Sequence, residues 1–329
     1  MKIFKNILLG IILLMVIVIL VIIGLEPVVI ELYLPENPLE DDTKKIIDLG
    51  VVPKTNSRSV RIVNNNIYIN DGGTYEVSGI LYNGTIYIDT SEDVTLNFNE
   101  VTIVNENTSV IDNRKSKKVI INLKSDTNNI LSDGSTSASA IKSVGDLFLQ
   151  GGGNLLIYGN NENGITVSNG SLIVDDIILY IIAQGDAFNV ANEFLINSGT
   201  VLGFANDEMQ PPSDLSKQNT LLFNFGSVFK ENTAFSLVNS QNESLINFIG
   251  LRDFKTLTLS IPKLDMGRYR LLKEISCDAR IKNGVYKECE ASGGEIVNIG
   301  ITDSYVVNAK WNWYGTMDII INYVEEIEI

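Results

Sequence analysis

The chain has 329 residues, 45% of them hydrophobic and 20% charged, a composition typical of a folded protein rather than a disordered one. Its 25 Lys and Arg against 40 Asp and Glu give a formal net charge of −15, which argues against nucleic acid as a partner. The sequence has no His and two Cys, which excludes His-dependent triads, His-ligated zinc, Cys₄ zinc sites and iron–sulfur clusters held by this chain alone. A bound metal would therefore be a hard cation held by oxygen atoms.

The N-terminus carries an apolar segment at residues 7–25, interrupted only by Gly10 and Gly24. As a helix this segment would be about 28 Å long, enough to cross the hydrocarbon core of a bilayer. Lys2 and Lys5 precede it, so the positive-inside rule places the N-terminus in the cytoplasm. The end of the segment lacks a small-residue cleavage site, which favours an uncleaved signal anchor over a cleaved signal peptide. We expect a single-pass cell-membrane protein, anchored by residues 1–25, with its C-terminal domain outside the cytoplasm.

Residues 26–58 combine several prolines with a cluster of acidic side chains. Proline stiffens a chain and charges keep it solvated, so this segment is interpreted as a stalk. A short helix over residues 42–49 is compatible with the pattern.

Residues 59–207 contain short runs of β-branched and aromatic residues, separated by Gly, Asn, Asp and Ser. Three of these runs are related as a repeat, because aligning Ile141, Ile165 and Phe188 gives spacings of 24 and 23 residues. Each repeat contains three short strands, which is the pattern of one coil of a parallel β-helix. The sequence therefore predicts an all-β protein, a right-handed parallel β-helix, with a strand-rich C-terminal part at residues 208–329.

Several motifs in the same order resemble a known family, over about residues 66–271. The motifs are Gly72–Gly79, Val94–Ile103, Asn128–Gly134, Asn163–Ile165, Asn197–Gly203 and Gly267–Leu271. Together they resemble the bacterial surface family of carbohydrate-binding domain proteins, which has a pectate-lyase-like parallel β-helix. The resemblance implies binding of polysaccharide. One member of the family contains calcium and binds polygalacturonate and cellulose.

The family resemblance also directs attention to one turn of successive coils. Oxygen-bearing side chains recur there, at Glu162, Asn163, Asp186 and Asp207. Stacked coils lie about 4.8 Å apart, so side chains one coil apart could share a calcium ion. Turn chemistry alone explains the same residues, because tight turns favour Asn, Asp and Gly. Both interpretations stay open, with calcium as the candidate cofactor.

Two other groups of residues have a functional and a structural interpretation. Residues 114–118 form a dense basic patch that could meet an acidic polysaccharide, or could be a charged turn. Trp311 and Trp313 would share one face of a strand, where they could stack on sugar rings or pack in a core.

Cys277 and Cys289 flank the turn sequence Lys282-Asn-Gly284. A three-residue hairpin loop there would place Ile281 opposite Val285, and the two cysteines would then face each other. Opposed Cα atoms lie about 5.5 Å apart, within reach of a disulfide, which an extracytoplasmic protein can keep oxidised.

The sequence offers little for catalysis. A pectate lyase would need a basic residue, and Arg114 is almost the only arginine of the β-helix region. A glycoside hydrolase would need a pair of carboxylates, but Asp175 and Asp176 would point to opposite faces of a strand. We therefore expect a non-catalytic, membrane-anchored polysaccharide-binding protein, with calcium as its candidate cofactor. The alternatives are a structural or adhesive surface solenoid that binds a protein partner, and a polysaccharide lyase. The ligand-binding residues are not identified by the sequence.

Overall fold

The computed structural model describes residues 44–315, apart from residues 135, 137, 138, 280, 283, 287, 288 and 301. The predicted anchor at residues 7–25 lies outside the described residues, and none of the described residues forms a helix long and apolar enough to cross a membrane. The described part is built from strands and belongs to one compact unit, Thr43–Ile329.

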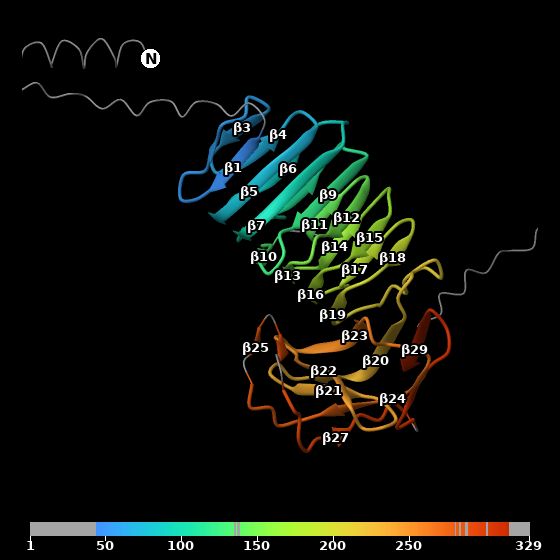
Figure 1. Cartoon of the computed structure of the whole chain (residues 1–329). Coiled ribbons are helices and arrows are strands. Elements are labelled where there is room, and N and C mark those ends of the chain that lie inside the picture. Colours follow the sequence, from blue (N-terminus) through green and yellow to red (C-terminus); the bar gives the residue numbers. More distant parts are fainter. Residues whose placement is uncertain are drawn as a thin grey trace, which may run out of the picture. The chain divides into compact units, whose positions relative to one another are not determined.

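The first two thirds of this unit form a β-solenoid whose coils stack along one direction (Figure 1). Each coil has three sides, and the strands of each side pair with those above and below. The first side contains β4 (Asn66–Ile69), β6 (Ile86–Ile88), β8 (Ile111–Asn113), β11 (Ser139–Ser143), β14 (Asn163–Val167) and β17 (Phe188–Val190). The second contains β5 (Gly73–Tyr82), β7 (Val94–Val104), β9 (Lys118–Leu123), β12 (Asp146–Gln150), β15 (Leu172–Asp175) and β18 (Phe194–Ile196). The third contains β10 (Asn128–Ser132), β13 (Asn154–Gly159), β16 (Ile178–Ala183) and β19 (Thr200–Ala205).

Strands β5 and β7 are long enough to serve two sides of their coils. The first part of β7 pairs with β9 and its last part pairs with β10, with a shift in register between β5 and β7 at the corner. The two sides that are separate strands in later coils are therefore one bent strand in the earlier ones.

The predicted repeat and its register are confirmed. Ile141 pairs in parallel with Ile165, and Ile165 pairs with Phe188. These side chains are at most 2% exposed and stack inside the coils. A 23- or 24-residue repeat thus returns the chain to the same side one layer further on, which buries a continuous apolar column.

The N-terminal end of the solenoid is capped by strands that the sequence did not indicate. β1 (Lys45–Leu49) pairs in parallel with β5, and β2 (Lys54–Thr55) pairs antiparallel with β1. Residues 45–49 are thus a strand rather than a helix, and residues 45–55 belong to the folded unit rather than to a stalk. β3 (Val60–Val63) closes the first side by pairing antiparallel with β4.

The third side continues beyond the last coil. β23 (Phe254–Ser260) pairs antiparallel with β19, β20 (Thr220–Phe229) pairs with β23, and β29 (Trp311–Gly315) completes the sheet. The boundary predicted between residues 207 and 208 therefore crosses a continuous sheet.

A second C-terminal sheet packs against the outer surface of this extended side. It contains β21 (Ala234–Val238), β22 (Ser244–Ile249), β24 (Gly267–Lys273), β25 (Ile281–Lys282), β26 (Val285–Tyr286) and β27 (Glu295–Ile296), with β28 (Tyr305–Val307) paired to β24. Tyr180 and Phe204, which point outward from the coils, are fully buried in a cluster with Phe248 and Phe254 of the C-terminal part. The solenoid and the C-terminal part thus share a core.

The Cys277–Cys289 disulfide is present, with Cα atoms 5.8 Å apart. The register predicted for the hairpin is wrong by one residue, because Ile281 pairs with Tyr286 and Lys282 with Val285. The turn is therefore one residue shorter than expected. Its Gly284 has a positive φ of 77°, as a hairpin turn requires.

The segment after the last coil covers the free strand edges at this end of the solenoid. Gln210 donates through Nε2 to the carbonyl of Val190 and accepts from the Val190 N–H through Oε1, both at 2.7 Å. One side-chain amide therefore replaces the strand that would otherwise pair with β17. The edge of β18 is covered by the backbone instead. The N–H groups of Ser213 and Gln218 donate to the carbonyls of Phe194 and Ile196.

Candidate functional site

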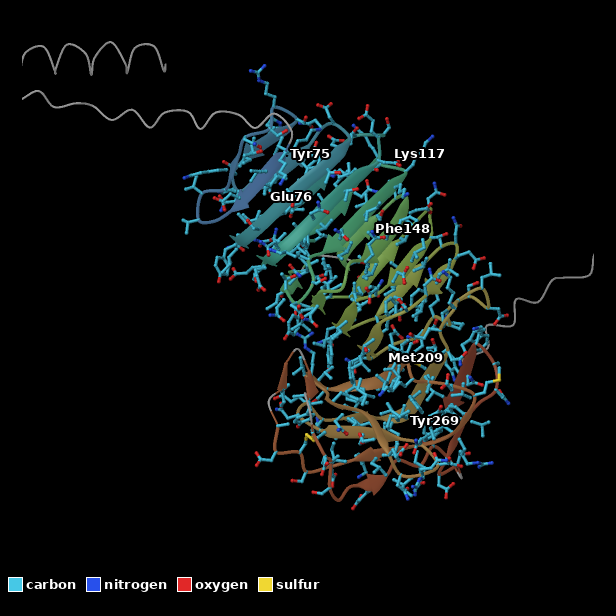
Figure 2. All side chains as sticks on the ribbon, viewed as in Figure 1. Tyr75, Glu76, Lys117, Phe148, Met209 and Tyr269 are labelled. Atoms are coloured by element: carbon cyan, nitrogen blue, oxygen red, sulfur yellow. A yellow bond between two sulfur atoms is a disulfide. The ribbon has the colours of Figure 1, made fainter. Side chains whose placement is uncertain are left out.

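A groove lies where the third side of the solenoid runs past the last coil. Gly203 of β19 pairs with Thr258, and Ala205 pairs with Thr256, so these β23 residues face the same side as the core of the coils. Beyond β19 no further coil covers that surface. It becomes the floor of an open groove of about 510 Å³. Met209, labelled in Figure 2, lies at this junction and lines the groove.

Two tryptophans form the aromatic part of the groove. Trp311 and Trp313 are two residues apart on β29, so both side chains point to the same face of the strand, and both line the groove. Asn312 between them points the other way and is 9% exposed. The two Trp positions are about 6.8 Å apart along the strand. Both indoles are half-buried, so each keeps some surface accessible to a ligand.

The floor also presents neutral polar groups. Asn224 of β20 pairs with Thr256 of β23, and both residues line the groove. Thr256 is 2% exposed, and its hydroxyl oxygen is buried without a hydrogen-bond partner. A buried hydroxyl without a partner costs free energy, so this group is well suited to hydrogen-bond with a ligand.

Another part of the lining, the acidic wall, carries carboxylates. Residues 206–209 supply it, and the side chains of Asp207 and Glu208 are exposed there. Asp186, one coil earlier, is half-buried, and its Oδ1 has no hydrogen-bond partner. Burial raises the pKa of Asp186 to about 6, and the charges of Asp207 and Glu208 add to this, while a hydrogen bond with the backbone of Glu208 acts in the opposite direction.

The structure brings together some of the predicted metal ligands. Asn163 Oδ1 accepts a hydrogen bond from the Asp186 N–H at 2.9 Å, and Asp186 is electrostatically coupled to Asp207. Glu162 is exposed, and its carbonyl accepts from the Gly185 N–H. Within the described residues no group of three or more His, Cys, Asp or Glu side chains could hold a metal ion. A calcium ion beside Asp186 would therefore also need amide, carbonyl and water oxygens, but the partnerless buried carboxylate oxygen suits a cation.

The basic patch adopts a structural arrangement. The Arg114 guanidinium lies 3.8 Å from the ring centre of Tyr87, which stacks on Tyr68, and Arg61 lies over Tyr68 at 4.1 Å. Arg114 also pairs with Asp112 at 3.0 Å. Burial acts to lower the pKa of Arg114, but the hydrogen bond and charge of Asp112 outweigh it, so the pKa lies above its ordinary value. A guanidinium held in its charged form is a poor general base.

The pair of carboxylates at the end of β15 is also occupied by structural contacts. Asp175 accepts a hydrogen bond from the Ser198 hydroxyl at 2.6 Å, whereas Asp176 is exposed and has a positive φ of 51°. The two residues belong to a turn and do not face each other across a cleft.

The tryptophans were recognised in the sequence as a possible sugar platform, but the groove was not. Its acidic wall and its two tryptophans come from segments about 100 positions apart, around Asp207 and Trp311. No repeat relates these two segments, so the sequence carried no signal for their proximity.

A groove with aromatic rings on one side and hydroxyl, amide and carboxylate groups on the others has the chemistry of a carbohydrate site. The apolar face of a sugar ring packs on indole, while its hydroxyls require the polar partners. Fold and groove together define a β-solenoid protein with a candidate binding groove at the end of its coil stack.

A family model described as "Carbohydrate-binding domain-containing protein" matches residues 63–211. This match covers most of the coils, and it confirms the resemblance that the sequence motifs indicated. The C-terminal part, including both tryptophans, lies beyond the matched residues.

One similar solved structure is titled "Structure of the polysaccharide lyase-like protein from C. thermocellum, Gadolinium derivative". It is 20% identical to this chain and covers 51% of this chain and 90% of its own, with a TM-score of 0.39. A similarity of that size carries no argument about function. A search of curated proteins finds no match.

Proposed function

We propose that the protein is a non-catalytic polysaccharide-binding protein whose ligand lies in the groove of Trp311 and Trp313. The observation that carries this proposal is the tryptophan pair on one strand face, beside the partnerless buried hydroxyl of Thr256. The family match over the coils supports the same ligand class. Binding without catalysis is supported by Arg114, which is stacked and ion-paired rather than placed as a base.

The proposed location is the outer side of the cell membrane. The support is the apolar segment at residues 7–25, preceded by Lys2 and Lys5. The Cys277–Cys289 disulfide agrees with an oxidising compartment.

Calcium is proposed as an accessory ligand held by Asp186 and Asp207 together with amide, carbonyl and water oxygens. Its support is the buried, partnerless Asp186 Oδ1 beside two other carboxylates. A cation there would neutralise charges that now repel one another.

A glycan array with the compact unit Thr43–Ile329 tests the function, run once with calcium and once with chelator. The fragment must include β1, because this strand pairs with β5. We expect binding to one or more polysaccharides. Trp313→Ala should weaken it about tenfold, the equivalent of about 1.4 kcal/mol. Tyr82→Ala is the matched control, because Tyr82 is 59% exposed but does not line the groove.

The absence of glycan binding in both conditions would contradict the proposal and favour a structural or adhesive solenoid. Equal losses from Trp313→Ala and Tyr82→Ala would place the ligand elsewhere on the molecule.

Calcium has a separate test in the melting temperature. A ligand that binds only the folded state stabilises it by about 2.7 kcal/mol at a hundredfold excess over Kd. Millimolar calcium should raise the melting temperature of the wild type, and Asp186→Ala should remove most of that increase. An unchanged wild-type melting temperature in calcium and in chelator would show that Asp186 is a turn residue.

A further inference from the structure

We infer that, when no calcium is bound, the groove selects uncharged polysaccharides and rejects those that carry carboxylates, with Asp207 and Glu208 as the residues that determine this specificity. The inference rests on the proposed function and adds the charge class of the ligand. Asp207 and Glu208 lie just inside the family match, which ends at residue 211, whereas Thr256 and both tryptophans lie beyond it.

The first step of the argument is the charge of the lining. Asp207 and Glu208 are both exposed on the wall, whereas Lys255 carries the one positive charge among the described residues of the groove. Asp186 lies close enough to both wall carboxylates for their charges to act on it. A negatively charged sugar entering the groove would therefore meet a net negative potential.

The second step is that the other contacts of the groove suit a neutral sugar. The indoles of Trp311 and Trp313 accept an apolar ring face and need no charge on the ligand. The Thr256 hydroxyl lines the groove without a hydrogen-bond partner and can donate to or accept from a sugar hydroxyl. Neutral polysaccharides present these partners at every ring.

The third step is that the wall carboxylates act differently on the two ligand classes. A carboxylate is an acceptor for hydroxyl donors, and such charge-assisted hydrogen bonds are stronger than neutral ones. Asp207 and Glu208 can therefore accept from the hydroxyls of a neutral sugar. A uronate places its own carboxylate near the same groups, where two acceptors repel and no proton is shared.

Two matched pairs of hexasaccharides test the inference. The first is a galacturonate hexamer with its carboxyl-reduced form, and the second is a glucose hexamer with its C6-oxidised form. Within each pair the linkages are the same and the charge differs. Binding is measured by calorimetry on Thr43–Ile329 at low ionic strength, with chelator to keep calcium from bridging the carboxylates.

In at least one pair we expect the uncharged hexamer to bind at least tenfold more tightly than its charged counterpart. Raising the salt to 1 M shortens the Debye length to about 3 Å, so the ratio between the affinities for the uncharged and the charged hexamer should decrease. Stacking on indole has no such salt dependence, so the change identifies charge as the cause.

The double variant Asp207→Asn/Glu208→Gln should bind the charged hexamer more tightly, and so reduce the ratio between the affinities for the uncharged and the charged hexamer. Asp214→Asn is the control, because Asp214 is an exposed carboxylate nearby in sequence that does not line the groove, and it should leave the ratio at its wild-type value. Thr256→Val, which keeps the side-chain shape, should weaken the uncharged hexamer severalfold.

The inference is overturned if neither pair shows tighter binding of its uncharged member, whether because both members bind equally or because neither binds. It is also overturned if the double variant leaves the ratio unchanged. A protein that binds polysaccharides on the array but fails these comparisons keeps its proposed function. A protein that binds none loses both.

Discussion

Asp186 combines burial with a like-charged neighbourhood, because the charges of Asp207 and Glu208 act on it. Its carboxyl is half-buried, and the wall formed by Asp207 and Glu208 makes ionisation still harder. In a protein without bound cation this residue is a source of instability at neutral pH. In a protein that binds calcium or a hydroxyl-rich ligand, the same carboxylate gains a partner.

The raised pKa of Asp186 makes a prediction about stability in chelator. Its folded-state pKa is about 6, above the unfolded value near 3.8, so the folded state binds the proton more tightly. The group therefore favours folding below about pH 4, and this contribution is lost as the pH rises through 6. After a discount for its partial exposure, the loss is about 1–2 kcal/mol.

The test is the melting temperature of wild type and Asp186→Asn at pH values from 4 to 7, in chelator. The wild type should lose stability relative to the variant as the pH rises. Asp214→Asn, at an exposed site, should follow the wild type. If the melting temperatures of wild type and Asp186→Asn change in parallel with pH, ionisation of Asp186 does not destabilise the folded protein.

At the scale of elements, the hairpin of β25 and β26 is fixed to the solenoid by its glycine. Gly284 has a positive φ, and a Cβ at this position would overlap the ring of Tyr180. Tyr180 is fully buried, and its hydroxyl donates to the carbonyl of Ile249, so the ring has no space to move.

Gly284→Ala should destabilise the protein by about 2–4 kcal/mol, because backbone strain adds to overpacking. Gly226→Ala is the matched control, since Gly226 also has a positive φ, of 68°, but has no atom within 4 Å of the added Cβ. Its cost should be about 1 kcal/mol. Urea denaturation of both variants provides the comparison, and equal costs would mean that the Tyr180 contact is unimportant.

A second element with a distinct role is the cap around Gln210. Its amide satisfies one donor and one acceptor at the edge of β17, and an open edge of this kind invites pairing with another chain. Gln210→Ala should cost about 1–2 kcal/mol and increase self-association, measured by light scattering at several concentrations.

Gln210→Glu is the informative companion variant. It keeps the acceptor for the Val190 N–H but replaces the donor to the Val190 carbonyl with a second acceptor, and two acceptors repel, so its cost should be at least that of Gln210→Ala. The cap has no structural role if both variants melt like the wild type and self-associate no more than it does.

Some elements were predictable from the sequence and others were not, and the reason is physical. The coils from Ile141 to Phe188 repeat an inward apolar residue at almost constant spacing, so both strand and register could be deduced. β1 could not, because proline and acidic residues dominate its surroundings and its partner is β5. The cysteine hairpin was placed correctly, but its register depended on a one-residue difference in the loop.

The candidate site was predictable only in part. Asp186 and Asn163 follow from the coil repeat, and their hydrogen bond confirms that they are neighbours. The approach of Trp311 and Trp313 to Asp207 depends on β29 joining β20, a pairing between segments with no common pattern.

At the scale of the whole molecule, the coils and the C-terminal part are a single folding unit. Tyr180, Leu202 and Phe204 point outward from the coils and are at most 1% exposed, because the C-terminal sheet covers them. A fragment that ends at residue 211, where the family match ends, would expose this surface.

We therefore expect the fragment of residues 43–211 to aggregate or to melt without cooperativity, whereas Thr43–Ile329 should unfold in one transition. Size-exclusion chromatography and circular dichroism on both fragments would check this. A monomeric 43–211 fragment with a sharp transition would show that the coils fold alone.

The stacking of coils has a consequence for how such proteins can change length. Because the coils before Ile130 pair only with their neighbouring coils, insertion of one repeat of about 23 residues among them would leave the N-terminal cap and the Gln210 cap intact. The insertion would displace the groove from the N-terminal cap by about 4.8 Å. The number of coils thus sets the distance between the groove and the N-terminal cap in fixed increments, independently of what the groove binds.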